Sequence, residues 1–151
     1  MTVVREATKS DIDAAGKLLA AQLEEHSLPA EPRQMARGLE AVFAAGKAAT
    51  LLLAEKDGRA VGVCLANRIA SVEYGGVVLF IEELFVEPAA RNHGVGRALL
   101  AFLLKAARAE GIRAVELEVD PGHEPARALY RSLRFEQNAR TPLVLDLRTR
   151  E

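Results

Sequence analysis

The chain has 151 residues, half of them apolar, which is enough for a single domain over residues 1–151 with its own core. A formal net charge of −1 and the lack of Trp argue against nucleic-acid binding, which requires a basic surface and aromatic rings for stacking. With one cysteine, Cys64, no signal-like N-terminus and no apolar run near the roughly 20 residues that cross a bilayer, we expect a cytoplasmic protein without disulfide, metal site or membrane contact.

An edge strand and two helices are predicted in the first third of the chain. Residues 2–7 alternate between apolar and polar side chains, as edge strands do. From Ser10 to Glu25 the apolar residues recur at helical spacing, and Asp13 lies three positions after Ser10, which is a capping-box pattern. A segment with two prolines then separates this helix from a second one predicted over 32–45.

Three strands joined by short turns are predicted next. The apolar runs at 49–55 and 59–70 are separated by Asp57 and Gly58, and an Asp-Gly pair in this setting is a strong hairpin signal. A second turn leads to a long apolar strand at 77–86. These three runs predict antiparallel strands that are neighbours in one sheet.

The last third alternates between helical and extended patterns. We predict a helix over 94–110, a strand over 112–119, a helix over 124–133, and two closing strands at 135–140 and 141–147. The resulting order, β-α-α-β-β-β-α-β-α-β-β, predicts an α+β domain on a mixed, mostly antiparallel sheet. Its central β-α-β unit should hold two parallel strands in a right-handed connection.

The turn RNHGVGR at 91–97 joins the long strand to the next helix. The first N–H groups of a helix lack partners and carry partial positive charge, so this end attracts anions. Gly94 and Gly96 let a phosphate approach the backbone, and Arg91 adds a cation with a fork of donors. The turn therefore predicts a cradle for a diphosphate, although an ordinary tight turn also uses glycines. The Walker pattern fails because Arg97 replaces its lysine, and the dinucleotide pattern lacks its third glycine.

Two motifs together resemble the GNAT superfamily of N-acetyltransferases. RNHGVGRALL is similar to the family's acetyl-CoA signature, Arg/Gln-x-x-Gly-x-Gly/Ala, and EPARALYRSLRFE is similar to its Tyr-bearing helix. The predicted element order is also that of the family, so the resemblance covers most of the chain. It implies the acyl-CoA N-acyltransferase fold and acetyl-CoA as cosubstrate. The residues that it assigns to the cofactor are Leu84, Val86, Arg91, Asn92, His93, Gly94, Val95, Gly96, Arg97, His123 and Tyr130.

Three positions depart from the family pattern. Asn92 stands where the family usually has glycine in the loop, and asparagine is the residue that best tolerates left-handed dihedrals after glycine. His123 replaces an asparagine that meets the pantetheine arm in relatives, which leaves that contact open. Arg134 replaces a glycine before Phe135, a change expected to affect only a turn.

Acetyl transfer to an amine requires a base, a donor for the developing oxyanion and an acid for the thiolate. The resemblance assigns the acid to Tyr130, whose reference pKa of about 10 keeps it protonated. It assigns the donor to the Val86 main-chain N–H, because the family's strand bulges here and frees main-chain groups for the cofactor. Consecutive Glu82 and Glu83 face opposite sides of a regular strand, so one should face the ligand. We take Glu82 as the first candidate for base or amine anchor and Glu83 as the second. The structural alternatives are that Tyr130 packs against the sheet and that the two glutamates are exposed at an edge or form ion pairs.

The predicted function is an acetyl-CoA-dependent N-acetyltransferase that moves an acetyl group to a primary amine of a small molecule or protein, by direct transfer in a ternary complex. The alternative is a CoA-binding regulatory or interaction module without transferase activity, which the changes at His123 and Arg134 would favour. The apolar run TPLVLDL at 141–147 is compatible with a homodimer or with a covered sheet edge. The candidate acceptor-reading residues are Glu24, Glu25, His26, Glu73 and Tyr74.

Overall fold

The computed structural model describes residues 1–148 and contains two compact units, Met1–Glu118 and a second unit that begins at Val119. The strands, all in the first unit, are β1 (Thr2–Glu6), β2 (Ala49–Lys56), β3 (Arg59–Ser71), β4 (Gly76–Val86) and β5 (Val115–Leu117). The helices are α1 (Ile12–Glu25), α2 (Pro32–Ala44) and α3 (Val95–Glu110) in the first unit and α4 (Glu124–Ser132) in the second.

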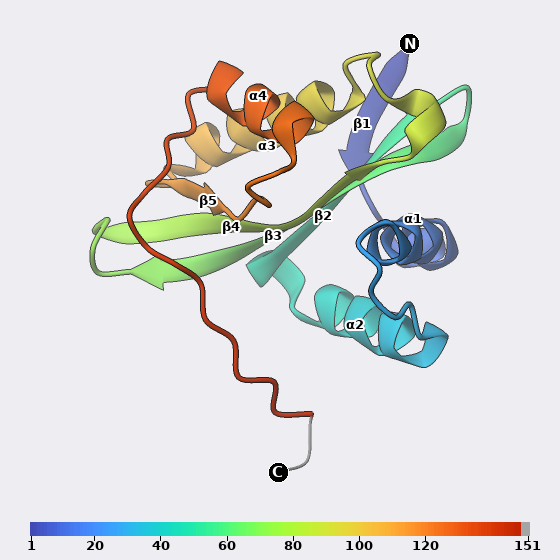
Figure 1. The fold of residues 1–151 in the computed structure, drawn as a ribbon, viewed down its shortest axis with the longest axis horizontal. Helices are drawn as coiled ribbons and strands as arrows, with labels where there is room; N and C mark the ends of the chain where they lie inside the picture. Colours follow the sequence, from blue (N-terminus) through green and yellow to red (C-terminus); the bar gives the residue numbers. More distant parts are fainter. Residues whose placement is uncertain (149–151) are drawn as a thin grey trace. The chain divides into compact units, whose positions relative to one another are not determined.

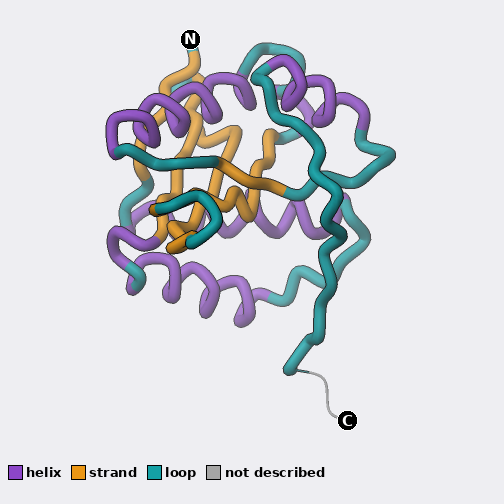
Figure 2. The backbone as a smooth tube through the Cα atoms, turned by 90° about the vertical axis from the view of Figure 1, so that its left-hand side faces the viewer, coloured by secondary structure: helices purple, strands orange, loops and turns teal. Residues whose placement is uncertain are grey.

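The first unit is a sheet between two layers of helices (Figure 1). Its five strands lie in the order β1-β2-β3-β4-β5, antiparallel up to β4 and parallel between β4 and β5. Helices α1 and α2 cover one face and α3 covers the other, as Figure 2 also shows. The core on the α1 face is formed by the buried side chains of Ala15, Leu18, Leu19, Leu39, Leu51, Leu53, Val63, Leu65 and Phe85. The mixed, mostly antiparallel sheet confirms the predicted fold class.

The predicted hairpin between β2 and β3 is confirmed. Asp57 and Gly58 have φ angles of 52° and 75°, and Lys56 pairs with Arg59 on either side of them. Two left-handed residues in a row give the turn whose twist matches that of the flanking strands.

The two closing strands predicted at 135–140 and 141–147 are wrong, since within the described residues 119–148 the structure has helix α4 and otherwise turns and irregular chain. The predicted strand at 112–119 shortens to the three residues of β5. Apolar composition favours an extended conformation, but a β-strand forms only where a neighbouring strand pairs with its backbone N–H and C=O groups. The side chains of Leu143 and Val144 are 93% and 90% exposed.

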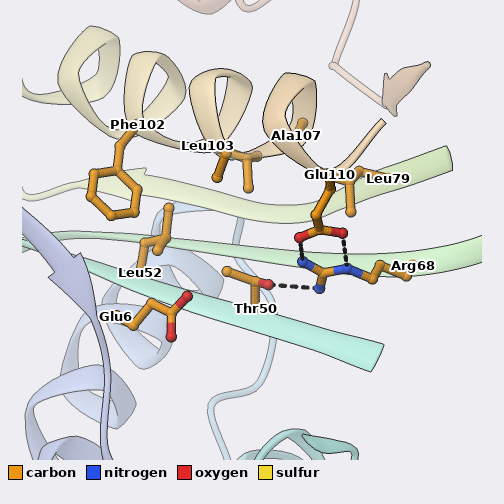
Figure 3. A pocket seen from close by; sticks show the side chains of 10 residues that line it. Glu6, Thr50, Leu52, Arg68, Leu79, Phe102, Leu103, Ala107 and Glu110 are labelled. Atoms are coloured by element: carbon orange, nitrogen blue, oxygen red, sulfur yellow. Dashed lines mark hydrogen bonds and ion pairs between the residues drawn. The ribbon is translucent and has the colours of Figure 1, made fainter. Parts of the chain in front are cut away.

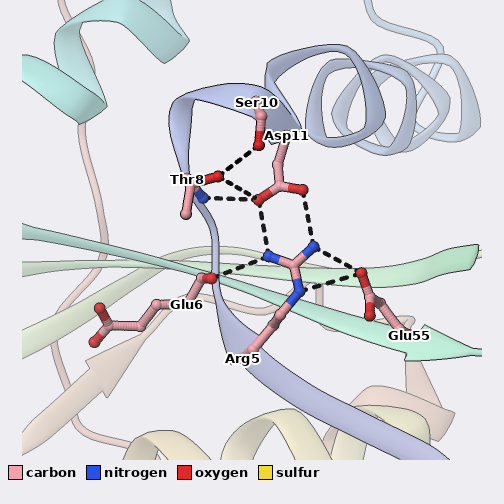
Figure 4. A network of polar contacts seen from close by, with 6 residues as sticks. All are labelled: Arg5, Glu6, Thr8, Ser10, Asp11 and Glu55. Carbon is pink, nitrogen blue, oxygen red and sulfur yellow. Dashed lines mark hydrogen bonds and ion pairs between the residues drawn. The ribbon is translucent and has the colours of Figure 1, made fainter. Parts of the chain in front are cut away.

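A polar network ties β1 to the start of α1 (Figure 4). The Arg5 guanidinium donates two hydrogen bonds of 2.8 Å to the Asp11 carboxylate and one of 2.7 Å to Glu55 on β2. Asp11 also accepts the Thr8 backbone N–H at 2.7 Å. The capping box is therefore formed by Thr8 and Asp11, before a 3-10 turn that leads into α1, and not by Ser10 and the residue three positions later as predicted.

Replacing Asp11 with asparagine should lower the free energy of unfolding by about 1–2 kcal/mol near neutral pH, because a charge-assisted fork is lost. Hydrogen bonds from Arg5 and from Thr8 hold the pKa of Asp11 well below its usual range. A carboxylate whose pKa is lower in the folded state than in the unfolded state stabilises the fold at pH values above its unfolded-state pKa. This stabilisation is lost as the pH falls toward the folded-state pKa. The wild-type advantage should thus shrink below about pH 4. Urea unfolding of the wild type and of Asp11→Asn at pH 7 and pH 3 measures this advantage. An equal difference in the free energy of unfolding at the two pH values would contradict this account.

On the other face, an ion pair fixes the last turn of α3 to the sheet (Figure 3). Arg68 of β3 donates to the Glu110 carboxylate through Nε at 2.9 Å and to Thr50 Oγ1 at 2.8 Å. Beside this pair lies a cavity of about 30 Å³, also lined by Phe102 and Leu103. That volume suits about one water molecule, so this cavity is not a cofactor site. None of the helices in residues 1–148 combines the length and apolarity needed to cross a membrane.

Candidate active site

Strand β4 carries a β-bulge at the predicted acidic pair. Leu65 of β3 pairs with Glu83, whereas Ala66 pairs with Ile81, so Glu82 is the extra residue opposite this step. Leu65 packs in the core on the α1 face, and its cross-strand partner Glu83 lies on the same face. The bulge therefore interrupts the regular alternation of side chains that the sequence predicted.

The extra residue also turns toward the α1 face. Glu82 accepts a hydrogen bond of 2.8 Å from Nδ2 of Asn67, which lies two residues after Leu65 on β3 and so on the same face. The expectation that Glu82 and Glu83 face opposite sides is wrong, because the bulge brings both carboxylates to one side.

The environment of Glu83 distinguishes it from its neighbour. Its side chain is partly buried, whereas Glu82 is exposed. Burial raises the pKa of Glu83, and the negative charge of Glu82 raises it further, while His26 and a hydrogen bond with Gln22 partly offset both effects. A partly desolvated carboxylate with a raised pKa is a stronger proton acceptor than an exposed carboxylate with an ordinary pKa. The structure therefore favours Glu83, the second candidate from sequence, over Glu82.

Gln22 and Asn67 were missed by the sequence interpretation. Gln22 lies on α1 one turn before His26, and its Nε2 also donates to the Leu84 carbonyl at 3.4 Å. The spacing of four residues puts Gln22 and His26 on one helix face, which is a signal that the sequence does contain. Asn67 is in a strand with no motif, and only the register with β4 reveals its partner.

Beyond the acidic pair, main-chain groups of β4 point away from β3. The ladder between β4 and β5 runs from Leu79 to Ile81. Farther along β4, the Leu84 carbonyl accepts from α1 and the Val86 carbonyl accepts a hydrogen bond of 2.8 Å from Nε of Arg91. The N–H and C=O groups of one strand residue point to the same edge, so the Val86 N–H also faces outward. This orientation suits the predicted role of Val86 as a donor.

The predicted phosphate loop adopts the backbone conformation that such a loop needs. Asn92 and Gly94 have φ angles of 65° and 77°, so asparagine occupies the left-handed position where the family usually has glycine. Nδ1 of His93 lies 2.7 Å from the Arg91 carbonyl oxygen and closes the turn. Within residues 1–148 no side chain caps α3, whose N-cap is Gly94, and the N–H groups of Val95 and the residue after it begin a helix without intrahelical acceptors.

A glycine on β3 brings this loop close to Val86. Gly62 pairs with Val86 across the ladder, and a Cβ on Gly62 would lie 3.1 Å from both Leu99 and Val95 of α3. Only the absence of a side chain allows the helix start to pack directly on the strand. The loop and the end of β4 are therefore neighbours.

The Arg91 side chain has partners other than those predicted. Its guanidinium forms an ion pair of 2.6 Å with Glu25 at the end of α1 and lies 5.4 Å from the centre of the Phe85 ring. With the bond to the Val86 carbonyl, the side chain folds back from the loop toward the α1 face. A direct contact of this guanidinium with a diphosphate stays a prediction.

The sequence profile of the acetyltransferase (GNAT) family matches residues 16–135, which include both the bulged strand and the loop. The chain belongs to the GNAT family. The uncharacterized N-acetyltransferase MJ1207 of Methanocaldococcus jannaschii is 36% identical over 85 residues, which are 55% of this chain and 37% of that protein. A mycothiol acetyltransferase of Thermomonospora curvata is 37% identical over 91 residues, which are 60% of this chain and 29% of that protein. The chain thus matches about a third of the length of these curated relatives.

The GNAT fold is also seen in a solved structure. A crystal structure of a predicted acetyltransferase with acetyl-CoA from Clostridium acetobutylicum superposes with a TM-score of 0.80 at 19% identity, and the match covers 97% of each chain. At 19% identity, this similarity establishes the fold alone.

In the GNAT chain, two predicted cofactor residues belong to the second unit. His123 precedes α4, and its carbonyl oxygen accepts the Arg127 N–H at 3.1 Å. Tyr130 is partly buried on α4, with its ring edge-on to Phe135 at 5.7 Å between centroids. Arg134 has a φ of 69°, the left-handed conformation expected where the family has glycine.

The structure brings only part of the predicted acceptor set near the acidic pair. Glu25 and His26 lie at the end of α1, which carries Gln22 toward Glu83. Glu73 and Tyr74 lie in the turn between β3 and β4, at the opposite end of β4. The nine residues from this turn to Glu83 span about 30 Å of strand, so the turn is remote from the acidic pair.

Proposed function

We propose that this protein is an acetyl-CoA-dependent N-acetyltransferase that acetylates a primary amine by direct transfer in a ternary complex. The observation that carries the proposal is that three functional features follow one another along the segment from Glu83 to Gly96 in the first unit. These are a partly buried carboxylate with a raised pKa, an outward-facing Val86 N–H and a left-handed glycine loop at a helix start.

The cofactor proposal rests on the loop and the edge of β4. First-turn N–H groups at Val95 and Gly96 suit a diphosphate, and the left-handed residues Asn92 and Gly94 shape the backbone around it. Acetyl-CoA, when bound, supplies an activated acetyl thioester. The Val86 N–H donates to the acetyl oxygen, where negative charge develops during attack.

The residues of the chain provide the proton transfers. Glu83, directly or through water, accepts the proton that the cationic amine must lose before its nitrogen can attack the acetyl carbon, and the second proton, lost from nitrogen as the amide forms, passes to solvent. Glu82, held by Asn67, adds negative charge that attracts the cationic amine before it loses this proton. By the family resemblance, Tyr130 is proposed to donate a proton to the sulfur as the carbon–sulfur bond breaks.

Replacing Tyr130 with phenylalanine should lower kcat about 100-fold, the lower range for loss of a general acid, while the ring contact with Phe135 is kept. Steady-state kinetics with acetyl-CoA and the preferred amine measure the change. The same substitution at Tyr74, in the remote turn, is the matched control and should leave kcat unchanged. A Tyr130 variant with wild-type kcat would remove this residue from the mechanism.

The acceptor is proposed as a small or protein-borne amine that is cationic in solution, because Glu82, Glu83 and Glu25 gather around the end of α1. A homodimer is proposed through the run at 141–147, since its apolar side chains at Leu143, Val144, Leu145 and Leu147 are exposed and their burial is favourable. Light scattering of the purified chain tests the dimer, and a monomer at all accessible concentrations would contradict it.

Isothermal titration with acetyl-CoA tests the cofactor half of the proposal. We expect saturable binding with a dissociation constant below 1 mM, which corresponds to about −4 kcal/mol. A titration without binding at millimolar acetyl-CoA would overturn the proposed function.

A further inference from the structure

The Arg91 guanidinium connects the loop, the end of β4 and the end of α1. Arg91 is the first residue of the loop, yet its side chain folds back five positions along the chain, where Nε donates to the Val86 carbonyl at 2.8 Å. Its Nη2 reaches Glu25, 66 positions away in sequence, at 2.6 Å. Its plane lies over the Phe85 ring, 5.4 Å from the centroid.

Two of these partners, the Val86 carbonyl and Glu25, belong to elements that the proposed reaction uses. The Val86 carbonyl follows directly on the N–H proposed to hold the acetyl oxygen, so a donor on this carbonyl restricts the rotation that would reorient that N–H. Glu25 ends α1, the helix that carries Gln22 to Glu83. The contact with Arg91 therefore links the start of the loop, the end of β4 and the end of α1.

The geometry separates this role from that of a diphosphate ligand. Arginine can serve several acceptors at once because its donors lie in a fixed plane and its face stacks on aromatic rings. Here Nε donates to a carbonyl and Nη2 to a carboxylate, while the guanidinium carbon lies over an aromatic ring. Arg91 and Glu25 are each 36% exposed, and the attraction of such a pair is modest in water, so its main effect is on orientation.

We propose that Arg91 is a positioning residue for acetyl transfer, which holds the Val86 end of β4 and the Glu25 end of α1 in register with the loop. This inference rests on the proposed function and deepens it. It separates the loop backbone, which serves the diphosphate, from the Arg91 side chain, which serves the acetyl end and the acceptor side.

The test compares Arg91→Gln, Glu25→Gln and the double variant by kinetics and by calorimetric titration with CoA. We expect each single change to lower kcat at least about tenfold, with the CoA dissociation constant within about threefold of wild type. The double variant should be no slower than the slower single variant, because the two residues act as one unit. Arg108→Gln, which removes an exposed charge near the other end of α3, is the control and should change neither value.

A second substitution, Arg91→Lys, keeps the charge but loses the planar fork. A positioning role predicts that kcat stays low in this variant while CoA affinity is retained, and this result stands even if Arg91→Gln folds poorly. CoA affinity that falls tenfold or more in Arg91→Gln and rises in Glu25→Gln would overturn the inference, because it would identify Arg91 as a diphosphate ligand released from Glu25. A wild-type protein without any turnover would instead overturn the proposed function.

Discussion

Replacing Glu83 with glutamine is expected to lower kcat/KM for acetyl transfer by about 100- to 1,000-fold, because an amide cannot accept the proton that the amine must lose. The substitution is nearly isosteric and keeps a side chain that can bond to Gln22. Kinetics with saturating acetyl-CoA and varied amine measure the effect. A rate within threefold of wild type would show that Glu83 is not the base.

The pH dependence of activity in the Glu82→Gln variant is an independent test of Glu83 as the base. Burial and the charge of Glu82 raise the pKa of Glu83, and a base is active when deprotonated, so activity should rise as pH increases through that pKa. Glu82→Gln removes the repulsion, lowers the pKa of Glu83 and should move the acidic limb of kcat/KM to lower pH. A limb that moves to higher pH in this variant would contradict the proposed coupling.

Replacing Gly94 with valine is expected to weaken acetyl-CoA binding by about 100-fold, because backbone strain and the added side chain both oppose binding. A β-branched residue is strained at a φ of 77°, which costs of order 1–3 kcal/mol. Among the described residues, no heavy atom that would meet a Cβ there lies within 4 Å, so the added side chain would project into the open space proposed for the diphosphate. Isothermal titration with acetyl-CoA measures the affinity.

Gly111 offers a matched control at the other end of the same helix. It has a φ of 76°, and a Cβ there would also meet open space. Gly111→Val should therefore cost similar stability in thermal unfolding while acetyl-CoA affinity stays unchanged. Equal loss of affinity in both variants would assign the effect to strain in α3 and not to the loop.

Features with a local cause were predictable from the sequence. The Asp57–Gly58 hairpin, the left-handed Asn92 and the helix that ends at Gly111 each depend on residues within a few positions of one another. The fold class and the order of elements up to α4 followed from such signals, and the resemblance then indicated which turn carries the cofactor.

Features with a tertiary cause were not predictable. The bulge that turns Glu82 to the side of Glu83 is a property of the ladder with β3: the residues of β4 alone indicate regular alternation, and only the family resemblance indicated a bulge in this strand. The direction of the Arg91 side chain depends on Glu25, which is distant in sequence. The apolar run at 141–147 has the composition of a strand, but composition does not supply the partner that a strand needs.

The most direct test of acetyl transfer is CoA release from acetyl-CoA in the presence of amines of different classes, followed with a thiol reagent. Burial raises the pKa of the single cysteine, Cys64, to about 12, so the protein itself should contribute little signal. We expect amine-dependent release that saturates with both substrates and yields an acetylated amine by mass spectrometry. Tight acetyl-CoA binding with no release above the amine-free rate, across small-molecule and peptide amines, would contradict the account and favour a CoA-binding module without transferase activity.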